Sequence, residues 1–295
     1  MAELIYPVGS ADEGLLVRSI ALSRLRMSYG QFKRAKFMGE ILLDGCPVHA
    51  NVRVHQGQTL VIRVPPGESA FIAPFAMPLT IPYRDENFCV IDKPAPLPSS
   101  SSPRKDTITL ENALYSAFGC PEGFIYRPVN RLDKGTSGLM LVALHAHAQQ
   151  RLQAMLHTDG FTREYLAVCQ GAPPAAEGII DLPIAKGEGA TIRREIRQEG
   201  KQARTHYRLL RSTGERSLVL LRLDTGRTHQ IRVHLQALGC PVTGDFLYGQ
   251  EHPALPGRFA LHSHRVVLQH PFSGQSLALE SPLPPELTAL LDATP

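Results

Sequence analysis

RLDKGTSGLMLVAL, residues 131–144, joins a polar corner to an apolar run. The run LMLVAL has the length and composition of a buried strand, which places the polar lead-in at a strand end that a ligand can reach. Alternate residues of an extended lead-in share a face, so Arg131 and Asp133 are expected to point one way and Leu132 into the core. Arg131 is therefore a candidate partner that keeps Asp133 ionised. An aspartate before Lys-Gly-Thr is also typical of an ordinary turn, and the spacing alone leaves both interpretations open.

Strand and helix patterns are mixed along the chain from residue 79 onward, and a long β region follows. Short apolar runs bounded by turn residues indicate strands, and apolar residues at helical spacing indicate helices. The predicted strands are residues 88–92, 163–171 and 217–223, the predicted helices are residues 109–118, 145–156 and 228–238, and the predicted hairpin is residues 258–284. We therefore predict an α+β fold with a large, mainly antiparallel sheet for a domain over residues 79–295.

The beginning of the chain has a different pattern. Residues 12–38 predict two helices, and the Asp-Gly and Gln-Gly turns after them predict short antiparallel strands. A small α/β module is therefore expected over residues 1–64, near the lower size limit for independent folding. A Pro-Pro-Gly sequence follows directly and begins a linker predicted for residues 65–78.

The composition indicates a soluble protein with reduced thiols. With 295 residues, of which 43% are hydrophobic, the chain is long enough to bury a core. No stretch approaches the ~20 continuous apolar residues of a membrane helix, and the first residues lack the basic and apolar parts of a signal peptide. We therefore expect a cytoplasmic location and no membrane partner. The five cysteines are scattered and odd in number, which indicates neither a disulfide framework nor a thiolate metal site.

Positive charge is concentrated in two segments, although the formal net charge is only +4. No acidic residue lies between Gly14 and Gly39, and residues 191–212 carry many basic side chains against two glutamates. A run of charge is usually a solvated face, but a segment without any carboxylate favours a polyanion as the partner. The candidate contacts in the first segment are Arg24, Arg26, Lys33, Arg34 and Lys36.

A second polar cluster is GRTHQIRVH, residues 226–234. On a helix that starts at its threonine, three-residue spacing places His229 and Arg232 on one face, while Ile231 and Leu235 share another. An arginine in this position can meet a carboxylate. The alternative is a helix surface that is polar without any function.

Other chemistries fit the sequence less well. No phosphate-binding GxxxxGK[ST] loop exists, and GTSG lacks the GxSxG spacing of a serine nucleophile. The histidine pairs HAH and HSH lack the helical spacing of metal ligands, so we predict no metal site. Asp133 is also a candidate phosphate acceptor of an aspartyl phosphotransferase. Nothing else in the chain supplies the magnesium-binding carboxylates that this alternative requires.

Five segments from residue 130 to residue 284 resemble, in this order, the successive motifs of the RluA-type family of RNA pseudouridine synthases. They are NRLDKGTSGLMLVAL, REYLAVCQG, GKQARTHYRLL, LDTGRTHQIRVHLQALGCPVTGDFLYG and RFALHSHRVVLQHPFSGQSLALESPLP. The resemblance covers the chain from about residue 80 to its end, and five ordered segments are far more specific than any one of them. The first module resembles the S-four RNA-binding domain, through QFKRAKFMGEILLDGCPV and VHQGQTLVI.

The resemblance implies that the protein converts a uridine within RNA to pseudouridine without a cofactor. It implies Asp133 as the essential carboxylate, Arg232 as its charge partner and Tyr165 as the residue against the uracil. Whether the carboxylate attacks the anomeric carbon or removes a sugar proton stays open. The implied substrate-binding residues are Arg131, Arg227, His229 and Ile231, where Arg131 contacts RNA near the flipped base and Ile231 gives apolar backing.

The chain departs from the family pattern at two positions, where Asn130 replaces a histidine and Pro96 replaces a glycine. Both departures leave the RNA contacts and the choice of substrate open. Large-subunit ribosomal RNA is the favoured partner by analogy, with transfer RNA second and a monomeric state expected. The remaining alternatives are an RNA-binding protein without catalysis and an aspartyl phosphotransferase.

Overall fold

The computed structural model describes residues 2–25, 27, 29–64, 72–100, 108–156, 158–189 and 192–292. The chain forms two compact units, Met1–Phe71 and Ile72–Pro295. The first half of the predicted linker, residues 65–71, lies outside the described residues, as does the candidate RNA contact Arg26. None of the helices in the described segments is long and apolar enough to cross a membrane.

The first unit is a four-stranded antiparallel sheet in the order β1-β4-β2-β3, covered by short helical segments. Asp44 and Gly45 both have positive φ, 50° and 81°, which is the geometry of the tight hairpin that the Asp-Gly sequence predicts. The strands are β1 (Ala2–Pro7), β2 (Glu40–Leu43), β3 (Cys46–Pro47) and β4 (Thr59–Val64), and the helical segments are η1 (Ser10–Asp12), α1 (Val17–Ser19), η2 (Ile20–Arg24) and α2 (Tyr29–Met38).

The first of the two helices predicted for residues 12–38 is shorter than expected, and this part of the prediction is wrong. Gly14 has a φ of 73° and turns the chain, and Leu15 then accepts a backbone hydrogen bond from Val54. Helical structure therefore begins only at Val17, and it passes from α1 into the π-helical segment η2. The second predicted helix forms as α2.

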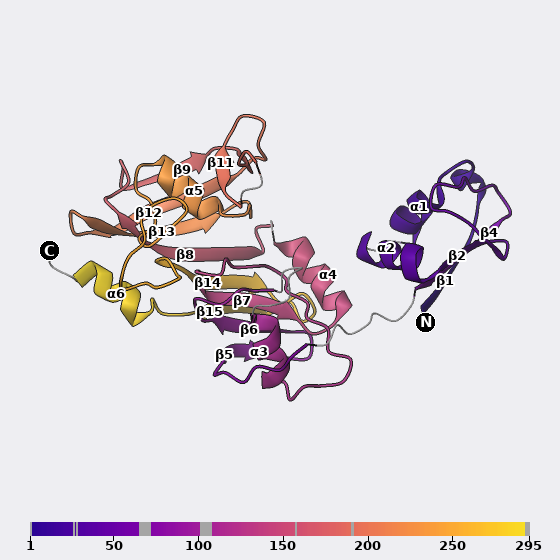
Figure 1. Ribbon diagram of the computed structural model, residues 1–295, viewed down its shortest axis with the longest axis horizontal. Coiled ribbons are helices and arrows are strands. Elements are labelled where there is room, and N and C mark those ends of the chain that lie inside the picture. Colours follow the sequence, from indigo (N-terminus) through magenta and orange to yellow (C-terminus); the bar gives the residue numbers. More distant parts are fainter. Residues whose placement is uncertain are drawn as a thin grey trace. The chain divides into compact units, whose positions relative to one another are not determined.

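The second unit is built on a nine-stranded sheet, and the prediction of a large, mainly antiparallel sheet is confirmed (Figure 1). Its order is β5-β6-β7-β14-β8-β13-β12-β9, with β15 also paired to β14. Among the strand pairs of the described residues, only β7 and β14 are parallel to each other. The strands are β5 (Thr80–Arg84), β6 (Phe88–Lys93), β7 (Ser137–Ala143), β8 (Phe161–Gln170), β9 (Glu177–Asp181), β12 (Arg204–Ser212), β13 (Arg216–Leu223), β14 (Leu261–Gln269) and β15 (Ser276–Glu280).

Strand β7 explains the continuous apolar run in the opening segment, because hydrophobic clusters cover both of its faces. Met140 and Val142 belong to one cluster, whereas Leu139 and Leu141 belong to another. Fully burying one such side chain stabilises the fold by about 1.5–3 kcal/mol. Leu132, in the lead-in, is buried in the first cluster as predicted.

The three predicted helices form as α3, α4 and α5, and α6 follows the last strand. Helix α5 contacts β11 and β12, and it starts at Gln230 because His229 has a left-handed φ of 59°. Gly239, with a φ of 78°, follows the end of the helix, in agreement with the predicted end at residue 238. The helices are α3 (Leu110–Ala117), α4 (Ala146–Met155), α5 (Gln230–Ala237) and α6 (Pro285–Asp292), and a separate strand pair is β10 (Ile184–Lys186) with β11 (Arg194–Ile196).

The topology brings three distant segments to one end of the sheet. Since β7 and β14 are parallel, the loop before β7 lies at the start of β14, where Ser263 pairs with Tyr165 of β8. The turn before α5 reaches the same place, because Arg232 of α5 contacts Asp133. The loop with Asp133, strand β8 and helix α5 therefore form one site.

Candidate active site

A cavity of about 530 Å³ opens where these three segments meet. It is lined by every residue that the sequence assigned to catalysis or to substrate binding in the larger domain. These residues are Arg131, Asp133, Tyr165, Arg227, His229, Ile231 and Arg232.

Asp133 is held by a buried arginine. Nη1 of Arg232 donates a hydrogen bond of 2.8 Å to Oδ2 of Asp133. Nε and Nη2 of the same guanidinium donate to the two carboxylate oxygens of Asp245, at 2.6 and 2.8 Å. This fork fixes the plane of the guanidinium and directs Nη1 to Asp133. Because Asp245 is fully buried and Arg232 is 2% exposed, water does not weaken the pair between these two residues.

The predicted ion pair between Arg131 and Asp133 is wrong. Arg131 lines the cavity and is exposed, but among the described residues the arginine paired with Asp133 is Arg232. Arg232 lies 99 residues away in the chain, so spacing around Asp133 does not reveal it. Arg131 is therefore free for a ligand.

The two oxygens of Asp133 have different surroundings. Oδ2 accepts from Arg232, and Nε2 of His229 lies 3.8 Å from the same atom. Oδ1 accepts no hydrogen bond from any described residue. The side chain is 28% exposed, in contrast to the buried carboxylate of Asp245. Oδ1 is therefore the oxygen that is available to a substrate.

His229 is oriented by Tyr248, which the sequence did not reveal as part of the site. The Tyr248 hydroxyl accepts a hydrogen bond from the backbone N–H of Arg194 at 2.7 Å and lies 2.8 Å from Nδ1 of His229. When the hydroxyl donates its proton to Nδ1, the proton of the neutral imidazole lies on Nε2, toward Asp133. Burial lowers the pKa of His229, against the opposing charge of Asp133, which keeps the ring neutral at pH 7.

The guanidinium of Arg232 also packs against aromatic rings. Its central carbon lies 4.1 Å from the centroid of the Phe259 ring and 5.0 Å from that of Tyr248. Burial alone would lower the pKa of Arg232, but Asp245 and then Asp133 raise it, so the group stays charged. Gly135 allows this packing, because a Cβ there would lie 2.7 Å from Cε1 of Phe259.

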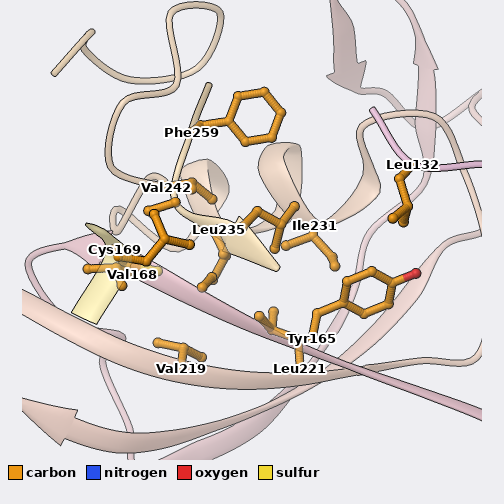
Figure 2. Close-up of a cluster of buried hydrophobic side chains, with 14 of the residues drawn as sticks. Leu132, Tyr165, Val168, Cys169, Val219, Leu221, Ile231, Leu235, Val242 and Phe259 are labelled. Atoms are coloured by element: carbon orange, nitrogen blue, oxygen red, sulfur yellow. The ribbon is translucent and has the colours of Figure 1, made fainter. Parts of the chain in front are cut away.

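Tyr165 forms the apolar floor of the cavity. Its side chain belongs to the same hydrophobic cluster as Leu132 and Ile231, and the residue is 5% exposed. Figure 2 shows its ring beside these two residues, with the hydroxyl oxygen directed away from Leu221. The hydroxyl forms no hydrogen bond with any described residue, so it is free to contact a bound base.

Lys93 and Leu97 support the loop that carries Asp133, and the sequence did not assign either residue to the site. Lys93 is fully buried, and its Nζ donates to the carbonyl oxygens of Pro94 and Leu97 at 3.0 and 2.8 Å. Leu97 in turn donates its N–H to the carbonyl of Lys134, next to Asp133. Burial lowers the pKa of Lys93 to about 7, although the charge of Asp133 opposes this shift.

Asn130, one of the two departures from the family pattern, has a defined structural contact. Its Oδ1 accepts a hydrogen bond of 2.9 Å from the N–H of Leu141, which fixes the orientation of the amide. Nδ2 is buried and has no hydrogen-bond partner among the described residues. This hydrogen bond anchors the segment that leads into β7 at Asn130, the residue before Arg131.

The candidate RNA contacts in the basic segment belong to the first unit. Arg24 donates to Asp12 at 2.8 Å, just before the segment without carboxylates, so its charge is partly neutralised. Lys33 and Lys36 lie exposed on α2, and Arg34 belongs to the same helix.

Comparisons with known proteins agree with this geometry. The family described as RNA pseudouridylate synthase matches residues 87–237. An uncharacterized RNA pseudouridine synthase of Bacillus subtilis is 33% identical over 258 residues, which cover 86% of this chain and 85% of that protein. Ribosomal large subunit pseudouridine synthase D of Nitrosomonas europaea is 41% identical over 231 residues, covering 74% of this chain and 66% of that protein. The solved structure of human RNA pseudouridylate synthase domain containing 1 has a TM-score of 0.58 at 27% identity, covering 74% of this chain and 96% of that chain.

The chain therefore belongs to the RNA pseudouridylate synthase family. Within that family it is of the RluA type, an isomerase that acts on RNA. The family named from the sequence motifs is confirmed. The similarity of the first unit to an S-four domain stays a prediction.

Proposed function

We propose that this enzyme isomerises one specific uridine in structured RNA and that Asp133 is its catalytic carboxylate. The proposal rests on the different surroundings of the two carboxylate oxygens of Asp133. Arg232 holds Oδ2, whereas Oδ1 accepts from no described residue in a cavity that Tyr165 also lines. A carboxylate that is fixed at one oxygen and open at the other is suited to react at a sugar carbon or a sugar proton.

The chemistry assigns each side chain a task. The bond between the ribose and N1 of uracil breaks, the base turns, and C5 forms the new bond while its proton is lost and N1 gains one. Asp133 supplies an oxygen for attack on the anomeric carbon or for removal of a sugar proton, and both routes require its ionised form. The Tyr165 ring stacks on the turning base, and its free hydroxyl is placed to transfer the proton.

Apolar and polar walls hold the flipped nucleotide. Ile231 is buried beside Tyr165 and gives the base an apolar wall. Arg131, Arg227 and His229 line the same cavity and supply donors to phosphate and base oxygens. A nucleotide must leave its stack to reach Asp133, and Arg131 is placed to fill the vacated space.

Large-subunit ribosomal RNA is the favoured substrate, with transfer RNA as the second choice. Relatives from Nitrosomonas europaea and Xanthomonas campestris are named as ribosomal large subunit pseudouridine synthases. A monomeric enzyme in the cytoplasm is consistent with such a substrate. Pseudouridine mapping in total RNA from cells with and without the gene tests this assignment, which predicts one missing modification in large-subunit ribosomal RNA. Loss of a pseudouridine in transfer RNA alone would instead assign transfer RNA as the substrate.

The two alternative functions have less support. An RNA-binding protein without catalysis has no need for a buried fork that aims Arg232 at Asp133. An aspartyl phosphotransferase requires carboxylates for magnesium, but Asp245 is occupied by Arg232, and no cluster of three metal-ligating side chains lies within the described residues.

A further inference from the structure

The outer face of α2 in the first unit carries two exposed aromatic rings. Tyr29 is 73% exposed and Phe37 is 67% exposed, whereas Phe32 and Ala35 of the same helix are buried in the core. Tyr29 and Phe37 are eight positions apart, so they lie on one face about 12 Å apart along the helix axis, at a rise of 1.5 Å per residue. Single exposed apolar side chains are common, but two large rings on one helix face are a feature that needs an explanation.

Lysines lie between and beside these rings. Lys33 is one helical turn from each ring, and Nζ of Lys36 lies 5.0 Å from the centroid of the Phe37 ring. Neither lysine forms an ion pair with any residue in the described part of the chain. No acidic residue occurs between Gly14 and Gly39, so no carboxylate of this segment cancels the positive charge of the face.

We infer that this face of α2 binds unpaired nucleotides of the RNA, with bases stacked on Tyr29 and Phe37 and phosphates at Lys33 and Lys36. Aromatic rings that alternate with cations are the usual means of holding single-stranded RNA, because every base has a face that stacks. A fully paired stem offers no free base to these rings. The inference rests on the proposed function only in taking RNA as the partner. It adds that the RNA substrate has an unpaired segment, which the first unit binds.

The composition of the face favours RNA over a membrane or a protein. A helix that lies in a membrane interface needs a continuous apolar side, whereas these two rings are separated by charges. Protein interfaces are depleted in lysine at their centre, but Lys33 lies between the rings. The charge and the spacing therefore match a polyanion with exposed bases.

The absence of tryptophan from the sequence allows a direct test. The variants Tyr29→Trp and Phe37→Trp each place a single indole on the face, and Ile5→Trp places one on β1, where Ile5 is 61% exposed. Titration of the full-length variants with a short single-stranded RNA should quench the indole at positions 29 and 37, and should leave the control unchanged. RNA binding without quenching at either position would overturn the inference. Quenching or a blue shift with anionic lipid vesicles, but not with RNA, would overturn it in favour of a membrane surface.

Binding measurements separate stacking from charge. Tyr29→Ala and Phe37→Ala should each weaken binding of the single-stranded RNA roughly fivefold or more, and should leave binding of the matched duplex unchanged. Tyr29→Phe keeps the ring and should bind as the wild type does. Lys33→Gln and Lys36→Gln should each reduce the slope of log affinity against log salt by ~0.7. Equal losses for single strand and duplex in the alanine variants would contradict stacking.

Isomerisation in the same variants distinguishes this inference from the proposed function. At saturating RNA, Tyr29→Ala should release tritium from RNA labelled at uracil C5 at the wild-type rate, because Tyr29 belongs to the first unit and the residues that line the catalytic cavity belong to the second. A wild-type protein that binds no RNA and releases no tritium would overturn the proposed function and the inference together. Tritium release without indole quenching at position 29 or 37 would overturn the inference and leave the proposed function intact.

Discussion

Arg232 binds Asp245 through two of its nitrogens and Asp133 through the third, so one guanidinium joins a fully buried carboxylate to an accessible one. Asp245 fixes the arginine, and the arginine fixes Oδ2 of Asp133. The position of the Asp133 carboxylate thus depends on Asp245, which is not among the described residues that line the cavity.

Replacing Arg232 by methionine should therefore remove activity and also destabilise the fold. The substitution leaves Asp245 buried without a charge partner, which costs about 3–5 kcal/mol in the free energy of unfolding. The double variant Arg232→Met, Asp245→Asn should recover much of this stability in urea denaturation but none of the activity. Recovery of tritium release in the double variant would show that Arg232 serves only the fold.

Tyr165→Phe separates stacking from proton transfer. The Tyr165 hydroxyl has no partner among the described residues, so its loss should change the free energy of unfolding by less than about 0.5 kcal/mol. RNA affinity should stay at the wild-type value, and kcat should fall about 100-fold, which is within the range of a general acid or base. Turnover at the wild-type rate would leave the tyrosine with a stacking role only.

Gly135→Ala tests the packing beneath Arg232. The new Cβ would lie 2.7 Å from Cε1 of Phe259, so the ring must move away from its place against the guanidinium. We expect a loss of about 1–3 kcal/mol in stability and a fall in kcat that exceeds any change in RNA affinity. Gly160→Ala is a suitable control, since its Cβ would meet Oγ1 of Thr158 at an ordinary 3.6 Å. Equal behaviour of the two variants would contradict the packing role.

Lys93 predicts a pH dependence of stability. Its pKa in the folded state is lowered by burial to about 7, whereas an unfolded chain has a lysine pKa of about 10.4. Between these values the unfolded state binds more protons, so the free energy of unfolding rises with pH, by at most about 1.4 kcal/mol per unit. The unfolding free energy of the wild type minus that of Lys93→Met should therefore increase from pH 6 to pH 9 in urea titrations. A constant difference over this range would show that the buried lysine does not titrate there.

The sequence predicts the residues that line the cavity better than it predicts the residues that hold them in place. Asp133, Tyr165 and Arg232 lie in motifs that resemble a known family, and the apolar run after Asp133 identifies β7. The wrong pairing of Arg131 arose because shared side-chain direction does not show which charge is in reach, and the true partner comes from another element. Asp245 lies within one of the motif segments, but only burial against Arg232 reveals its role.

The remaining errors and omissions have a similar origin. The start of the first helix depends on Gly14 and on a backbone contact of Leu15 with Val54, which no local pattern encodes. Lys93 follows a strand and has the sequence appearance of a surface residue, and its burial depends on the carbonyl groups of a loop.

The most direct test of the catalytic assignment is Asp133→Asn. The amide keeps the size of the side chain and part of its hydrogen bonding, but it is neither a nucleophile nor a base. Thermal melting should first show a folded protein, and RNA binding should survive because phosphate contacts dominate affinity. Tritium release from RNA labelled at uracil C5 should then be absent. A folded, RNA-binding Asp133→Asn protein that releases tritium at the wild-type rate would contradict the role of Asp133 and the mechanism built on it.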